Sequence, residues 1–105
     1  MLSIHDVMLD AIFTMRPVVR AIEGCDRDLA SQLKRAASSV VLNIAEGSGS
    51  AGGVRKQRYR AALGSAREAW SCLLVAKAAG YVEELPSGLG AQFNRVIGTL
   101  VRVAA

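Results

Sequence analysis

Apolar side chains recur every three or four residues along almost the whole chain, and this helical period constrains the fold more than any other feature. In the first segment, the residues that follow this period are Ile4, Met8, Ala11, Met15, Val18 and Ile22. Residues spaced in this way share one face of an α-helix and pack against a core. The pattern predicts a first helix over about residues 3–23, kinked at Pro17, because proline removes a backbone donor and crowds the preceding turn.

Three more apolar stripes follow and predict helices over about residues 27–47, 54–79 and 86–104. The first of them is made of Leu29, Leu33, Ala36, Val40 and Ile44. The next is made of Tyr59, Ala62, Ala66, Trp70, Leu73 and the aliphatic stem of Lys77, and the last of Leu89, Phe93, Val96, Leu100 and Val103. Each stripe keeps the same spacing, so each helix is expected to turn one face inward.

Glycine, proline and aspartate mark the expected helix boundaries. Gly24 suits the left-handed end of the first helix, and Asp26 suits the N-cap of the second. The stretch GSGSAGG, residues 47–53, predicts a flexible turn. Gly80 is expected to end the third helix, and Pro86 suits the first turn of the fourth.

Length and composition favour one small helical domain. The chain has 105 residues, of which 51% are hydrophobic and only 5% aromatic, with alanine, leucine and valine dominant. Small aliphatic side chains suit close helix packing better than a β-sandwich. Together with the four stripes, this predicts an all-α fold, an antiparallel up-down-up-down four-helix bundle formed by residues 1–105 as a single domain.

The N-terminus and the cysteines point to the cytoplasm. Asp6 and Asp10 interrupt the first segment, where a signal peptide needs a basic stretch followed by an apolar one, and no apolar run is long enough to span a membrane. Cys25 and Cys72 are far apart and form no CxxC pair, so both are expected to be reduced thiols.

The sequence NIAEGSG, residues 43–49, places an amide and a carboxylate next to the apolar stripe of the second helix. On a helical wheel, Gln32, Ser39, Asn43 and Glu46 fall in one band that borders this stripe. Polar groups at the edge of a packed face need partners, and Ser65 and Glu68 of the third helix are the expected ones, with Arg60 or Arg67 available to neutralise a carboxylate. The interpretation is a structural polar network between the helices; a ligand site and a contact between subunits are the alternatives.

A strongly basic run begins the third helix. Between Glu46 and Glu68 there is no acidic residue, whereas five cations occur, Arg55, Lys56, Arg58, Arg60 and Arg67. Lys56, Arg60 and Arg67 share one side of the helix, so they form a ridge that could follow phosphates. With a net charge of +4, nucleic-acid binding is a reasonable hypothesis, and Lys34 and Arg35 are further candidates. A solvated basic face is the alternative.

The outer face of the third helix carries small residues where a solvent-exposed helix normally carries charges. Ala61, Gly64, Cys72 and Val75 share this side, together with Ser65 and with Glu68 as its single charge. Small residues allow another helix to approach closely, so this face is interpreted as an oligomer contact. Coverage by the first helix of the same chain is the alternative.

The run SQLKRAASSVVLNIAEGSG, residues 31–49, followed by ALGSAREA, residues 62–69, resembles a known family. These are the bacterial four-helix-bundle proteins encoded within intervening sequences of large-subunit ribosomal RNA genes. Their relatives are the accessory variability proteins of diversity-generating retroelements. The residues that carry the resemblance are Gln32, Ala36, Ala37, Ser39, Asn43, Ile44, Ala45, Glu46, Gly47, Gly49, Gly64, Ser65 and Glu68.

The resemblance implies a homopentamer with basic residues gathered around a tapered barrel. In the retroelement branch it implies binding to nucleic acid and to a reverse transcriptase, and in neither branch does it imply an enzyme. Non-specific binding of RNA or DNA by an oligomer is therefore the first functional hypothesis. An adaptor or scaffold for a protein such as a reverse transcriptase, without nucleic-acid binding, is the second.

Catalysis and metal binding are not expected. Metal sites in helix bundles need several inward carboxylates and usually Glu-x-x-His pairs, whereas His5 is the one histidine here and lies at the N-terminal fringe. A nucleophile that needs a neighbouring histidine has no partner in the helices. The sequence predicts no catalytic residue, metal or cofactor, and no membrane association.

Overall fold

The computed structural model describes residues 2–105, and in this range the chain forms five α-helices and no strands. The helices are α1 (Ile4–Thr14), α2 (Arg16–Glu23), α3 (Arg27–Ser48), α4 (Gly52–Ala78) and α5 (Leu89–Val103). The all-α class is as predicted. The fifth helix arises because the predicted first helix is divided into α1 and α2 at Met15.

The division between α1 and α2 has a local cause. Pro17 lies in the first turn of α2 and has no N–H to continue the hydrogen-bond ladder from α1. The Thr14 hydroxyl also donates to the Asp10 carbonyl at 2.8 Å, a back-bond that favours a bend. The kink predicted at Pro17 therefore occurs two residues earlier and ends the helix.

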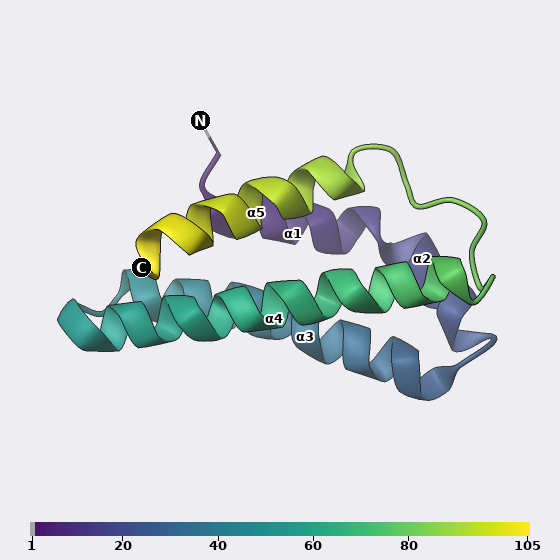
Figure 1. Ribbon diagram of the computed structural model, residues 1–105, viewed down its shortest axis with the longest axis horizontal. Helices are drawn as coiled ribbons and strands as arrows, with labels where there is room; N and C mark the ends of the chain where they lie inside the picture. The colour runs from purple at the N-terminus through teal and green to yellow at the C-terminus, as the bar shows by residue number, and fades with distance from the viewer. Residues whose placement is uncertain (1) are drawn as a thin grey trace.

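The helices run back and forth along one long axis. α3 and α4 lie side by side in opposite directions, and α5 returns along α4 and α1 (Figure 1). α2 continues beyond α1 and packs against α3. A 27-residue helix is about 40 Å long at 1.5 Å per residue, so α4 alone accounts for the 42 Å length of the molecule.

One apolar cluster joins the inward faces of all five helices. The largest fully buried side chains include Phe93, Met8, Met15, Ile22, Leu33, Leu73, Leu89 and Leu100. The Trp70 ring packs on Phe93 with 5.3 Å between the ring centroids. Within residues 2–105 no polar or charged residue is fully buried, so burial of apolar surface is the main stabilising term.

Several predicted boundaries need correction. Asp26 does cap α3, accepting from the Leu29 N–H at 2.9 Å, but Gly24 is right-handed with φ −70°. In the stretch GSGSAGG, the first two residues end α3 and the last two begin α4, so the turn is only residues 49–51.

The fourth predicted helix starts later than expected. Pro86 lies in the loop rather than in a first turn, and α5 begins at Leu89 after Gly88, whose φ of 86° suits glycine. The predicted inward positions Val103 and Lys77 are both exposed, and Ala104 is buried instead. Lys77 forms an ion pair of 3.6 Å with Glu84.

Candidate nucleic-acid interface

A small hydrogen-bonded group joins α3 to α4 halfway along their contact. The Ser39 and Ser65 hydroxyls are hydrogen-bonded to each other at 2.8 Å. The Asn43 amide donates to the Ser39 hydroxyl at 3.1 Å and to the Ser39 carbonyl at 2.9 Å. All three side chains are partly buried, so each bond replaces water that packing has removed. These residues form the polar contact between the helices.

Other members of the predicted network lie outside it. Gln32 and Glu68 are exposed and have no side-chain hydrogen bond within the described part of the chain. Glu46 is also exposed, and its carboxylate pairs with Arg58 at 2.9 Å rather than with Arg60 or Arg67. A helical wheel gives the angle at which each of these side chains leaves its helix, but not its distance from the contact between α3 and α4.

Gly47 is a packing position rather than a helix stop. It is buried inside α3, and a Cβ at this position would lie 2.6 Å from Cε1 of the Tyr59 ring. The Tyr59 hydroxyl meets the Ser48 hydroxyl at 3.4 Å. Glycine therefore allows the Tyr59 ring of α4 to lie directly on the α3 backbone, which explains why glycine follows Glu46 in this sequence.

Two arginines of the basic run stabilise helix ends. The Arg55 Nε donates to the Gly47 carbonyl at 3.2 Å and to the Ser50 carbonyl at 2.8 Å, at the C-terminal end of α3. The Arg60 Nε donates to the Ala104 carbonyl at 3.1 Å, just after α5. Cations at helix C-termini satisfy free carbonyls and oppose the helix dipole. Both side chains have a structural role in addition to their charge.

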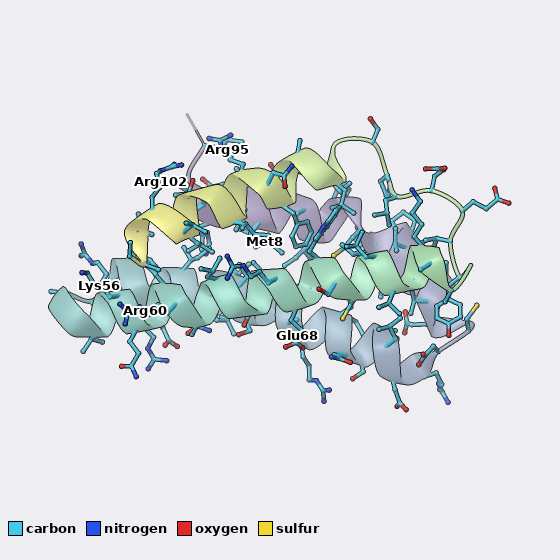
Figure 2. All side chains as sticks on the ribbon, viewed as in Figure 1. Met8, Lys56, Arg60, Glu68, Arg95 and Arg102 are labelled. Carbon is cyan, nitrogen blue, oxygen red and sulfur yellow. The ribbon has the colours of Figure 1, made fainter. Side chains whose placement is uncertain are left out.

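The other predicted cations differ in whether they have a partner. Lys34 pairs with Glu23 at 3.5 Å. Lys56, Arg67 and Arg35 are exposed and have no hydrogen bond or ion pair among residues 2–105. Figure 2 shows Lys56 and Arg60 near the N-terminal end of α4, beside the end of the chain, and Arg95 and Arg102 on the far side of α5.

A shallow groove of about 450 Å³ lies over α3 and the start of α4. Its lining contains Lys34, Arg35 and Arg58 as cations, Glu46 as an acid, and the polar side chains of Ser38, Ser39 and Asn43, with Leu42. Hydroxyl and amide groups beside lysine and arginine are the groups that contact phosphate and sugar oxygens in nucleic-acid complexes. The groove therefore brings three of the seven predicted binding residues together.

Two cations that the sequence reasoning missed lie on α2. Arg16 and Arg20 line a second groove, of about 360 Å³, with Lys34 and Glu23 and an apolar floor. Their spacing of four residues places them on one side of a helix and was a usable signal. This spacing is less conspicuous in the sequence than the basic run of α4, which has more cations.

The predicted oligomer contact on α4 needs one correction. Ala61, Gly64 and Val75 are exposed, but Cys72 is only 3% exposed and faces the core. Burial, and secondarily the negative charge of Glu68, raise the pKa of the Cys72 thiol. α3 covers part of this face, through the hydrogen bond between Ser39 and Ser65.

Cys25 is an exposed free thiol in the turn before α3, and Cys72 is also free. In the part of the chain that the structure describes, no three His, Cys, Asp or Glu side chains are grouped so as to hold a metal ion. None of the helices among residues 2–105 is both long and apolar enough to cross a membrane.

A protein-family model described as "23S rRNA-intervening sequence protein" matches residues 16–100. The match begins at the first residue of α2 and ends within α5, so it contains the polar contact, the groove over α3 and α4 and the basic run, and all of the second groove's lining except Ile12 and Met15. Comparisons with curated proteins and with solved structures gave no match.

Proposed function

The chain belongs to the 23S rRNA-intervening sequence protein family, and from this premise we propose that it is a non-enzymatic protein that binds nucleic acid without sequence specificity. The binding surface is the cationic face of α3 and the N-terminal half of α4. α1 and α2 together serve as one bent arm of an antiparallel four-helix bundle that carries this face.

The observation that carries the proposal is an uncompensated exposed charge. The first 16 residues of α4, residues 52–67, contain five cations and no acid, and all five are exposed. Among the described residues, Glu46 is the one acid paired with them, through Arg58. Lys56 and Arg67 keep their full donor capacity, and Arg35 and Lys34 extend the charge across the α3 groove.

The exposed positive charge on α3 and α4 can bind phosphates, but it cannot distinguish one base from another. Cations that meet phosphates release condensed counterions, which supplies most of the free energy of non-specific binding. Base reading needs side chains arranged in a groove or stacked on unpaired bases, and the basic run offers only Tyr59, whose ring is partly buried on Gly47. The proposed binding is therefore electrostatic and strongly dependent on salt.

The test is a salt titration with short RNA and DNA, single-stranded and duplex, using the full chain. The double substitution K56Q with R67Q removes two of the exposed positive charges and should weaken binding. It should also reduce the slope of log affinity against log salt by about 1.4 to 1.8, because each phosphate contact contributes roughly 0.7 to 0.9. A control that loses the same charge elsewhere, R27Q with R102Q, should change the slope much less. No binding at low salt, or equal effects of the two pairs, contradicts the proposal.

Self-association is part of the proposal. Nine large apolar side chains are exposed among the described residues, including Leu9, Phe13 and Leu42 on α1 and α3 and Leu74 and Val75 on α4. Exposed apolar surface of this kind is typical of contacts between proteins. Five copies is the number that the family resemblance implies, and mass measurement by light scattering tests it; a single subunit at all concentrations contradicts it.

A protein adaptor is the second candidate, because two of these exposed apolar residues, Phe13 and Leu42, lie beside cations. Such a surface suits an acidic protein, for which a reverse transcriptase is the candidate that the resemblance implies. Retention of a purified partner after nuclease treatment supports an adaptor, whereas loss of the partner on nuclease treatment supports nucleic-acid binding.

A further inference from the structure

Phe13 is an aromatic side chain that the fold leaves in solvent. It occupies the last turn of α1 and is 68% exposed. The guanidinium carbon of Arg16 lies 5.2 Å from the ring centroid, so a planar cation covers part of the ring. A hollow beside it is lined by Phe13, Thr14, Arg16, Pro17 and Arg20. The proposed binding face on α3 and α4 does not use this site.

Three grooves adjoin one another through shared residues. Arg16 and Arg20 line both the hollow at Phe13 and the groove between α2 and α3. Lys34 and Ser38 line both that groove and the groove over α3 and α4. Since α2 and α3 pack side by side (Figure 1), the shared lining residues connect the hollow at Phe13 to the groove that contains Arg58.

This surface is basic along its whole length. Its lining cations are Arg16, Arg20, Lys34, Arg35 and Arg58. Its two acids, Glu23 and Glu46, are both paired with lining cations, at 3.5 Å with Lys34 and 2.9 Å with Arg58. The five cations exceed the two acids by three charges.

The middle groove adds an apolar floor. Met15, Val19 and Ala37 are buried beneath it, and Ile12 is partly buried. Phe13 is outside because it lies on the side of α1 opposite the buried residues Met8 and Ala11. Cations beside an aromatic ring and an apolar floor suit an unpaired nucleotide, which has a flat face and a phosphate.

We propose that the three grooves form one track for a single strand of nucleic acid, with an unpaired base stacked on Phe13 and Arg16 and the following phosphates on Arg20, Lys34, Arg35 and Arg58. This inference rests on the proposed function and makes it more specific. The bases of a duplex are already stacked on one another and cannot use Phe13. Single strands therefore bind more tightly than duplexes of equal length.

The experiment measures binding of fluorescent 20-nucleotide oligo-uridine, oligo-thymidine and a 20-base-pair duplex to the full chain at low salt. F13A and F13L should lower single-strand affinity by roughly 5- to 150-fold, the range for loss of one stacked base. F13W should restore it. N94A removes an exposed side chain of α5 outside the track and outside the exposed apolar residues, and is the control, expected to change affinity less than twofold. Each variant is first shown by circular dichroism to be folded.

Four results overturn the inference. Equal affinity for duplex and single strands, unchanged by F13A, overturns the track while leaving the proposed function intact. If F13L binds single strands as tightly as the unchanged protein, the ring is not stacked on a base. A fall in molecular mass with F13A, without a change in affinity per subunit, shows that Phe13 is a contact between copies. No binding of any oligonucleotide overturns the proposed function and this inference together.

Discussion

Replacing Gly47 by alanine tests whether the Tyr59 ring fixes α4 on α3. The new Cβ would lie 2.6 Å from Cε1, 2.8 Å from Cδ1 and 3.2 Å from Cζ of Tyr59. Carbon atoms in contact are normally about 3.5 to 4.0 Å apart, so the ring must move by roughly 1 Å. The Tyr59 hydroxyl then also loses its position next to Ser48.

Two opposing terms set the size of the effect. Overpacking a well-filled contact costs about 1 to 3 kcal/mol. Alanine inside a helix is about 0.8 to 1 kcal/mol more favourable than glycine, and Gly47 lies inside α3. The free energy of unfolding of G47A should therefore fall by about 0 to 2 kcal/mol, and the melting temperature by up to roughly 15 °C for a chain of this size.

A double-mutant cycle separates the two terms. In a Y59A background the clash is absent, so G47A should raise the free energy of unfolding by about 0.5 to 1 kcal/mol, measured by urea denaturation. G64A is the matched control, because Gly64 lies inside α4 with no atom near its absent Cβ, and it should stabilise the protein. A coupling between positions 47 and 59 below about 0.5 kcal/mol refutes the packing argument.

Two further predictions concern buried groups. S65A removes the partner of the Ser39 hydroxyl, so urea denaturation should show a loss of about 0.5 to 1.5 kcal/mol; no loss contradicts a role for this hydrogen bond. A thiol reagent at neutral pH should label exposed Cys25 quickly and Cys72 slowly, because burial and the raised pKa keep Cys72 protonated. Labelling of Cys72 should accelerate with rising pH or with urea, and equal rates at the two sites at neutral pH contradict its burial.

Periodicity was enough to predict the helical fold and much of the core. Leu33, Val40 and Ile44 of α3 are buried as the stripe requires. Pro86 was misleading, because proline suits a loop as well as a first turn, and only the packing of the preceding loop decides between them. A helical wheel shows the direction in which a side chain points, but not whether a neighbouring helix covers it. For this reason the sequence predicts Cys72 on the outer face, although it is buried.

The candidate site was less predictable than the fold. The density of cations in α4 is visible in the sequence, but the assignment of Arg55 and Arg60 to helix ends depends on carbonyl groups that approach only in the folded chain. The exposure of Phe13, by contrast, follows from the sequence. Phe13 lies two positions from both Ala11 and Met15, so it falls on the side of α1 opposite the apolar stripe.

The contact between Gly47 and Tyr59 also limits which changes of sequence the protein can tolerate. Sliding α4 by one turn along α3 would shift its side chains by about 5.4 Å relative to those of α3. Insertions in the turn at residues 49–51 can lengthen the loop without changing this alignment. A bulkier residue at position 47 must push the Tyr59 ring off the α3 backbone, so the two helices should tolerate a change in the length of their connecting turn far better than a larger side chain at this contact.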